Sequence, residues 1–365
     1  MLTTRQPVLR KFWYATLRLD DLKAGPKPFT LMGTEIVLFL DENEAPVALR
    51  DRCCHRTAKL SIGWCEQGRI VCGYHGWTFD GTGALVRIPQ YPDDKPLPQV
   101  GVDAFHCQAR YGYAWVCLDE PIAGIPAITE DDDPGFRRIM QIHETWRTSP
   151  MRLMENSFDA AHPAFVHRNT FGRIEAPRPT RVSLTETDDG FWTEGKTEFN
   201  NPANGHRVTG STEPTVVRDT RTTWYLPFCR KLDISYDGRI RHIIFNCATP
   251  VDDEHIVVAQ ILFRNDSEAD CPAEELIAWD SAIVAEDKLV LEATEYDAPL
   301  DASDGEEASM ISDRPGLVMR KQMLALLRAH GETEVRREGE RPYVFRKGAR
   351  PIASAELAAE EAGIG

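Results

Sequence analysis

The sequence lacks any run of the ~20 consecutive apolar residues that a membrane-spanning helix needs. Residues 1–10 lack the apolar stretch of a signal peptide, so we expect a cytoplasmic protein. Positive charge is scarce as well: 42 Lys and Arg residues stand against 57 Asp and Glu residues, for a net charge of −15. This balance disfavours binding to nucleic acid phosphates or to anionic membranes. We therefore expect neither as a partner.

The nine cysteines are an odd number, and no export signal accompanies them, so a disulfide framework is unfavourable. Cys53 and His55 form a Cys-x-His pattern, and Cys72 and His75 form a Cys-x-x-His pattern. Two facing loops of this kind can hold a two-iron cluster, with the cysteines on one iron and the histidines on the other. A structural zinc site is the alternative, although zinc sites usually present both cysteines before both histidines.

These two loops resemble the Rieske domain of ring-hydroxylating oxygenases, whose usual forms are Cys-Pro-His-Arg-Gly and Cys-Pro-Tyr-His-Gly-Trp. Here Cys54 replaces the first proline, Thr57 the first glycine and Gly73 the second proline. None of these is a ligand position. The resemblance implies a Rieske 2Fe-2S cluster with Arg56 and Trp77 in its surroundings. Its implied ligands are Cys53, His55, Cys72 and His75.

A second set of candidate ligands follows about eighty residues downstream. Asp159 and His162 are three residues apart and share a face of a helix predicted over Pro150–His162. His162 and His167 lie about 140° apart on an ideal helix, so a straight helix cannot bring both to one ion. Pro163 disfavours helical geometry at His162, and we expect the helix to end there. Two histidines and a carboxylate make the facial triad typical of non-haem ferrous iron.

A long helix predicted over Pro272–Tyr296 offers the carboxylate. Asp287 lies in the middle of an apolar stripe of this helix. A buried unpaired carboxylate is costly, so it should be neutralised or bind a metal. Asp280 lies on the same stripe two turns earlier and is the alternative ligand. The segment 285–292 resembles the one that carries the third ligand in Rieske demethylases and hydroxylases, which favours Asp287.

The resemblance covers nearly the whole chain and implies an α+β fold. An N-terminal all-β Rieske domain over residues 1–125 would be followed by a catalytic domain over residues 126–365. That second domain would have the helix-grip fold, a curved antiparallel sheet wrapped over a long helix. Two hairpins are expected from the strand patterns, one in each part of the chain. Their strands are Ile36–Leu40 with Val47–Leu49, and His242–Thr249 with His255–Arg264.

The same resemblance implies a terminal oxygenase. Electrons from NAD(P)H would arrive through a ferredoxin or a flavin/iron–sulfur reductase, and O2 would be activated at a mononuclear Fe(II) held by His162, His167 and Asp287. His75 would face Asp159 of the partner subunit, so Asp159 is expected to be an electron bridge and not a ligand. Asn156 is expected near the iron. A homotrimer or larger ring follows from this bridge.

The chain looks closer to the α-only homotrimeric members, so we expect hydroxylation or oxidative demethylation of a small aromatic or cyclic substrate. The alternatives are a cis-dihydroxylating dioxygenase, a Rieske electron carrier with an inert second domain, and a helix-grip binding protein with structural zinc. Trp224, Tyr225, Leu226 and Phe228 line an apolar pocket or form core. A further helix is predicted over Leu317–His330. Its basic side chains would either bind an anionic substrate or simply face the solvent; they are Arg320, Lys321 and Arg328.

The segment from Arg50 to Arg69 is basic on an otherwise acidic chain, with five basic residues against two acidic ones. A basic rim around an electron entry point would steer an acidic redox partner to it. A solvated loop with chance charges is the alternative. The basic residues are Arg50, Arg52, Arg56, Lys59 and Arg69.

Overall fold

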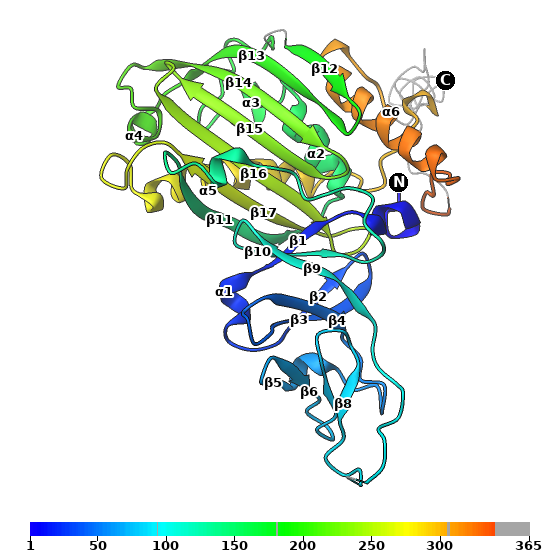
Figure 1. Ribbon diagram of the computed structural model, residues 1–365. Helices are drawn as coiled ribbons and strands as arrows, with labels where there is room; N and C mark the ends of the chain where they lie inside the picture. The colour runs from blue at the N-terminus through cyan, green and yellow to red at the C-terminus, as the bar shows by residue number, and fades with distance from the viewer. Residues whose placement is uncertain (93, 180–181, 305–306, 340–365) are drawn as a thin grey trace, which may run out of the picture.

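A computed structural model describes residues 1–92, 94–179, 182–304 and 307–339 of the chain (Figure 1). In these residues the chain forms three antiparallel sheets. No helix among them is long and apolar enough to cross a bilayer. Two of the short helices are α1 (Leu19–Leu22) and α4 (His206–Thr209).

The N-terminal part holds two of the sheets, as the predicted all-β domain requires. The hairpin predicted near residue 40 is confirmed, since β3 and β4 pair with Ile36 opposite Arg50. The six-stranded sheet has the order β1 (Tyr14–Arg18), β10 (Tyr113–Cys117), β9 (Ala104–Arg110), β4 (Pro46–Arg50), β3 (Thr34–Leu40) and β2 (Lys27–Leu31). The four-stranded sheet contains β5 (Trp64–Glu66), β6 (Arg69–Val71), β7 (Thr78–Phe79) and β8 (Leu85–Arg87).

The C-terminal part is built on a seven-stranded sheet. The second predicted hairpin is confirmed, with His242 of β16 opposite Arg264 of β17. The predicted division after residue 125 falls in the segment between β10 and β11, and the boundary itself stays a prediction. The strand order is β11 (Arg137–Trp146), β17 (Ile256–Arg264), β16 (Ile240–Pro250), β15 (Cys229–Tyr236), β14 (Thr215–Tyr225), β13 (Gly190–Asn200) and β12 (Ser183–Thr187).

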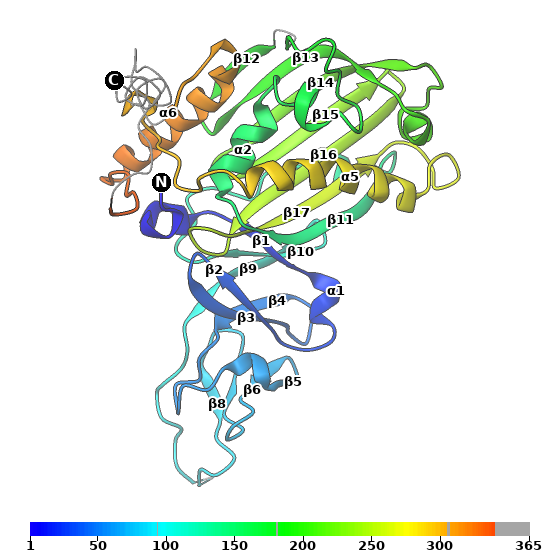
Figure 2. The same ribbon diagram turned by 180° about the vertical axis from the view of Figure 1, so that it is seen from behind.

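Helix α5 (Ala273–Leu291) lies across one face of this sheet, which is the predicted helix-grip arrangement (Figure 2). Its apolar side chains Leu276 and Trp279 pack with Leu262 of β17. Acidic residues occupy its first turn and Lys288 its last, where each complements the helix dipole. The helix ends at Leu291, so the predicted end at Tyr296 was wrong by a little more than one turn.

The opposite face of the seven-stranded sheet packs against the six-stranded sheet. Trp115 of β10 and Tyr111 of the turn before it share a core with Phe245 of β16 and Ile261 of β17. Every residue of β17 is buried in consequence. The seven-stranded sheet is therefore a rigid wall, with α5 on one side and the six-stranded sheet on the other. The four-stranded sheet lies at the far end of the molecule from α5 (Figure 1).

The predicted helix over Pro150–His162 is wrong in its last part. Helix α2 (Pro150–Phe158) begins after Ser149, whose hydroxyl accepts a hydrogen bond from the N–H of Arg152 at 3.4 Å. It ends at Phe158 because Asp159 is extended, with φ −81° and ψ 120°. The Asp159 carboxylate accepts a hydrogen bond from the N–H of Ala161 at 2.7 Å, a local bond that competes with helix formation. Asp159 and His162 therefore share no helix face.

The prediction for Pro163 was also wrong. His162 keeps helical dihedrals, with φ −60° and ψ −33°, and Pro163 opens the short helix α3 (Pro163–Val166). Proline suits this first position because its missing N–H has no partner to lose there. The chain breaks before His162 and not after it. His162 and His167 then stand at the two ends of a single helical turn.

Helix α6 (Arg314–Ala329) packs against α2 and confirms the helix predicted near the end of the chain. Arg320 of α6 is buried, and its guanidinium bonds both carboxylate oxygens of Glu155 on α2. It also donates to the Pro299 carbonyl at 2.8 Å and to Glu307 at 2.6 Å. Arg320 thus holds α6 to α2 inside the protein. Neither predicted role is correct, because its guanidinium neither binds a substrate nor faces the solvent.

We expect Arg320→Ala to lower the free energy of unfolding by about 1.5–3 kcal/mol, because Glu155 and Glu307 lose a buried cation and keep Arg152 as their partner. Lys321 is the matched control: it is 75% exposed and lies 3.9 Å from Glu186. Lys321→Ala should change the free energy by less than about 0.5 kcal/mol. Denaturant unfolding measures both. Equal effects of the two substitutions would contradict this role of Arg320.

Candidate metal centres

The two cysteine–histidine loops have the same backbone structure. In the first loop, the N–H of Cys53 donates to the Ala58 carbonyl at 2.8 Å, and the N–H of Thr57 donates to the Cys53 carbonyl at 3.0 Å. Cys72 makes the two equivalent bonds in the second loop, at 2.8 and 2.9 Å. The fifth residue of each loop is left-handed, with φ +59° at Thr57 and +71° at Gly76. The two loops therefore share a backbone pattern, although the histidine is the third residue of the first loop and the fourth residue of the second.

The four side chains face one another as a cluster site requires. Cys53 and Cys72 are 2% and 1% exposed, and the rings of His55 and His75 lie 4.5 Å apart between centroids. Trp77 stacks on His55 at 4.4 Å. The Nδ1 atom of His55 is buried and has no hydrogen-bond partner in the described part of the chain. A buried nitrogen without a partner fits a metal ligand.

Burial raises the pKa of the Cys53 thiol to about 11, with the Cys72 sulfur adding to the rise. A thiolate in this position therefore needs a cation beside it, which iron would provide. The loops thus suit a 2Fe-2S cluster, and the assignment of its four ligands stays a prediction.

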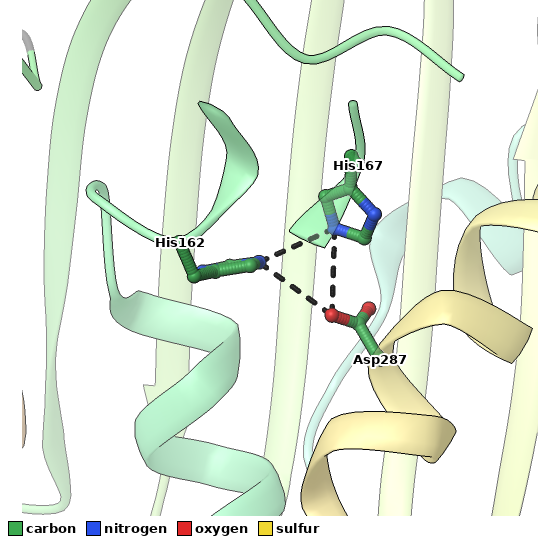
Figure 3. Close-up of side chains that lie close together, drawn as sticks. All are labelled: His162, His167 and Asp287. Atoms are coloured by element: carbon green, nitrogen blue, oxygen red, sulfur yellow. Dashed lines mark hydrogen bonds and ion pairs between the residues drawn. The ribbon is translucent and has the colours of Figure 1, made fainter. Parts of the chain in front are cut away.

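The second candidate centre joins three side chains from two segments far apart in the sequence (Figure 3). His162 and His167 flank α3, and Asp287 lies near the end of α5. The two Nε2 atoms are 3.3 Å apart, and Asp287 Oδ1 lies 3.6 Å from the first and 3.4 Å from the second. His167 is buried, and the other two residues are partly buried.

The other ring nitrogen of each histidine is already occupied. His162 Nδ1 lies 2.9 Å from the Asp159 carbonyl, and His167 Nδ1 lies 3.1 Å from Glu286 Oε2. Carbonyl and carboxylate oxygens are acceptors, so each Nδ1 carries the proton and each Nε2 presents a lone pair. Burial lowers the pKa of His162, which keeps its ring neutral, although Asp287 opposes the shift. Three acceptor atoms therefore face one another, and a cation between them satisfies all three.

Asp287 has one further partner, because the side-chain amide of Asn156 on α2 donates to its Oδ1 at 2.9 Å. Asp280, the alternative ligand from the sequence, is held elsewhere. Its Oδ2 accepts from Gln141 Nε2 at 2.5 Å and lies 3.1 Å from His242 Nε2. Asp280 therefore belongs to a buried polar network on the sheet, while Asp287 meets the two histidines.

Sequence reasoning missed Glu286. Thr170 donates to its Oε2 at 2.8 Å, the same oxygen that His167 contacts, so the carboxylate is fixed in place. A residue next to a ligand on a helix normally points 100° away from it, and no spacing pattern could identify it. The role of Glu286 becomes apparent only in the folded chain, where the loop after α3 packs on α5.

A cavity of about 220 Å³ opens beside the three side chains. Helices α2 and α5 form one side of it, and strands β13 to β17 form the other. The predicted apolar pocket residues lie outside its lining: Trp224 and Phe228 are buried in the core, and the Trp224 indole donates to the Pro227 carbonyl at 3.1 Å. The core interpretation of those strand residues is the correct one.

A Rieske-like pair of loops, a helix-grip domain and a two-histidine, one-carboxylate site together define a Rieske-type non-haem iron oxygenase. Comparison with known families agrees: the Rieske [2Fe-2S] domain matches residues 12–103, and the vanillate O-demethylase oxygenase C-terminal domain matches residues 146–329. The chain belongs to this family and is an oxidoreductase. It uses a Rieske cluster, a mononuclear iron, and NAD(P)H through partner proteins.

Two demethylases from Pseudomonas putida are similar over most of their length. Methylxanthine N1-demethylase NdmA is 31% identical over 335 residues, 89% of this chain and 91% of that protein. Methylxanthine N3-demethylase NdmB is 29% identical over 86% of this chain and 88% of its own. The solved structure of Pseudomonas putida CBB5 NdmA has a TM-score of 0.75 and covers 90% of this chain and 94% of its own. Dicamba monooxygenase, 22% identical with a TM-score of 0.75 and coverage of 88% and 98%, shares the fold.

We expect Asp287→Ala to lose the mononuclear iron and to keep the visible spectrum of the cluster, because it removes one of three converging acceptors. Asp280→Asn is the matched control on the same helix and should keep both metals. Iron analysis with absorption spectroscopy measures both variants. Retention of the third iron by Asp287→Ala, or its loss from Asp280→Asn, would contradict the ligand assignment.

Glu286→Ala should weaken iron binding about 10- to 100-fold, since His167 loses the acceptor that fixes its ring and its proton. Glu286→Gln keeps an acceptor oxygen and should lose less. Glu274, an exposed residue in the first turn of α5, provides the control Glu274→Ala. Competition with a chelator gives the iron affinity of each. Identical affinities for all variants would exclude a positioning role for Glu286.

Proposed function

We propose that this terminal oxygenase carries out oxidative demethylation, or a related monooxygenation, of a small cyclic substrate. The observation that carries the proposal is the position of the three acceptor atoms at the wall of a 220 Å³ cavity. A metal held from one side keeps its other positions free for O2 and leaves the cavity for substrate. The two similar demethylases support removal of a methyl group from nitrogen, and the vanillate O-demethylase match supports removal from oxygen.

The reaction balances with one O2, two electrons and two protons. One oxygen atom enters a C–H bond of the methyl group, and the hydroxymethyl product loses formaldehyde to leave N–H or O–H on the ring. The other oxygen atom leaves as water. The electrons come from NAD(P)H through partner proteins. Ferrous iron supplies the oxygen activation when it is bound.

The chain's own residues hold and enclose the reacting groups. His162, His167 and Asp287 would hold the iron, and the Asn156 amide orients Asp287 through its Oδ1. Leu153 and Phe158 of α2 line the cavity together with Ile283 of α5. These apolar side chains exclude water from the site, which limits side reactions of activated oxygen.

Electron supply requires a second copy of the chain in this proposal. The cluster loops lie at the end of the molecule away from α2, α3 and α5 (Figure 1). His75 is partly exposed there, and at the other end the Asp159 side chain is 31% exposed beside His162. A homotrimer in which His75 faces Asp159 of the partner subunit would join the two ends. This trimer and a cytoplasmic location stay predictions.

The partner that delivers electrons would be an acidic ferredoxin or reductase. Two of the basic residues near the loops are internally paired, Lys59 with Glu35 at 2.7 Å and Arg50 with Asp103 at 3.4 Å. Arg52, Arg56 and Arg69 are exposed and remain available. The basic surface is therefore smaller than the sequence suggested, and it is centred on the first loop.

The reaction is tested with the iron-replete enzyme, a surrogate reductase, and methoxy- or N-methyl-substituted ring compounds under labelled O2. We expect formaldehyde in equal amount to the demethylated product, with one labelled oxygen atom transferred and the other found in water. Release of a cis-diol that contains both labelled atoms would instead show dihydroxylation. Turnover of none of these compounds, with normal cluster reduction, would contradict the proposed demethylation.

Asp159→Asn should keep both metals and slow oxidation of the cluster at least about 100-fold, because the charged bridge beside His162 is lost. Asp237→Asn is the control, because Asp237 is exposed and does not line the cavity. Stopped-flow absorption of the reduced enzyme mixed with O2 and substrate measures the rate. An unchanged rate in Asp159→Asn would contradict the bridge.

A further inference from the structure

Two polar side chains face the cavity from the sheet without partners. Arg230 of β15 and Asn246 of β16 are directly opposite each other in the strand register, and both line the cavity. Both therefore lie on the face of the sheet that α5 covers (Figure 2). Arg230 Nε and Asn246 Oδ1 are buried, and neither has a hydrogen-bond partner within the described ranges. The two atoms do not bond each other either.

Two other charged groups of the cavity wall have partners within the chain. Arg218 has a buried Nε without a hydrogen-bond partner too, but its guanidinium stacks on Phe171 and Phe199, with its central carbon 4.1 and 4.7 Å from the ring centroids. Asp280 is bonded to His242 and Gln141, as described above. Arg230 has neither an aromatic face nor an ion pair among the residues that the structure describes. Since buried charges are normally paired, its partner should come from outside the chain.

The register places Arg230 opposite the candidate iron site. Asp280 contacts His242 at 3.1 Å, which fixes the level of α5 against β16 at that point. From Asp280 to Asp287 the helix advances seven residues, about 10.5 Å. From His242 to Asn246 the strand advances four residues, about 13 Å. Asn246 and its neighbour Arg230 therefore lie level with Asp287, on the other side of the cavity.

We propose that Arg230 and Asn246 form the specificity subsite of this enzyme, where the guanidinium binds a carboxylate on the substrate ring and the Asn246 Oδ1 atom accepts from a hydroxyl or N–H group beside it. The inference rests on the proposed function and narrows its substrate to a cyclic acid. The carboxylate is held across the cavity from the iron site, so the oxidised methyl group lies on the opposite side of the ring. A neutral substrate would leave the guanidinium unpaired.

The protonation state of Arg230 agrees with this role. Burial lowers its pKa to about 10, and the charge of Asp287 opposes the shift. The side chain is still a cation at neutral pH. A guanidinium can donate two parallel hydrogen bonds to a carboxylate, and such charge-assisted bonds are about twice as strong as neutral ones. The free oxygen of Asn246 can accept from a hydroxyl or N–H beside the carboxylate.

The test compares the binding of para-methoxybenzoate with that of its uncharged isostere para-methoxybenzamide. The oligomeric enzyme, replete in cluster and iron, is titrated by calorimetry without O2, so that no turnover occurs. We expect the acid to bind at least about 10-fold more tightly than the amide. Arg230→Gln should weaken acid binding about 10- to 100-fold and leave amide binding within about 2-fold. Arg230→Lys keeps the charge and should fall between these values.

Arg221→Gln is the matched control, because Arg221 lies on the neighbouring strand β14, is exposed, and lies 3.7 Å from Glu194 outside the cavity. It should leave both affinities unchanged. Cluster absorbance and iron content establish that each variant is folded. Equal binding of acid and amide to the wild type, no binding of either, or an equal loss of both in Arg230→Gln would overturn the subsite.

Failure of the subsite and failure of the proposed reaction are distinguishable, since binding is measured without oxygen. If the enzyme prefers the acid through Arg230 but releases no formaldehyde, the subsite is supported and the demethylation is contradicted. An enzyme that releases formaldehyde but binds the acid and the amide equally tightly supports the reaction and contradicts the subsite.

Discussion

Two imidazole nitrogens and a carboxylate oxygen, all acceptors, converge to 3.3–3.6 Å, and the rest of the catalytic half is arranged to hold them there. Asp287 is positioned by α5, whose apolar side packs on the sheet through Leu276 and Trp279. The histidines are positioned by the single turn α3, and their outer nitrogens are fixed by Asp159 and Glu286. Three lone pairs directed at one point repel unless a cation lies between them, so the fold is complementary to a metal ion.

The candidate cluster site in the N-terminal part also brings potential metal ligands together, and two of them are cysteine sulfurs. Two loops of matching hydrogen-bond pattern present two buried sulfurs and two imidazoles. Left-handed backbone at Thr57 and Gly76 closes each loop, and Thr57 is notable because a side chain rarely adopts this conformation. A cluster held at one tip and an iron held under α5 belong to opposite ends of one chain. In the proposed trimer, the tip of one subunit would meet the catalytic domain of the next.

Much of this was predictable from local patterns. The spacing of Cys53, His55, Cys72 and His75 predicted the loops. The apolar stripe of the long helix left Asp280 and Asp287 open, and the resemblance of the segment 285–292 favoured Asp287, which lies beside the two histidines. The path between the two iron histidines was not predictable, because an aspartate turn at Asp159 ended the helix early and Pro163 started a new one. Contacts between distant segments, such as Glu286 with His167 or Arg320 with Glu155, have no sequence pattern, since they depend on how α5 and α6 pack.

The central claim is that one chain holds a mixed-ligand iron cluster and a separate ferrous ion bound by His162, His167 and Asp287. Mössbauer spectroscopy of protein loaded with isotopic iron tests this most directly. The account predicts two cluster irons in unlike ligand environments and one further high-spin ferrous iron whose signal changes when a ring substrate is added. A single class of iron with four sulfur ligands, or no iron beyond the cluster after anaerobic loading, would contradict it.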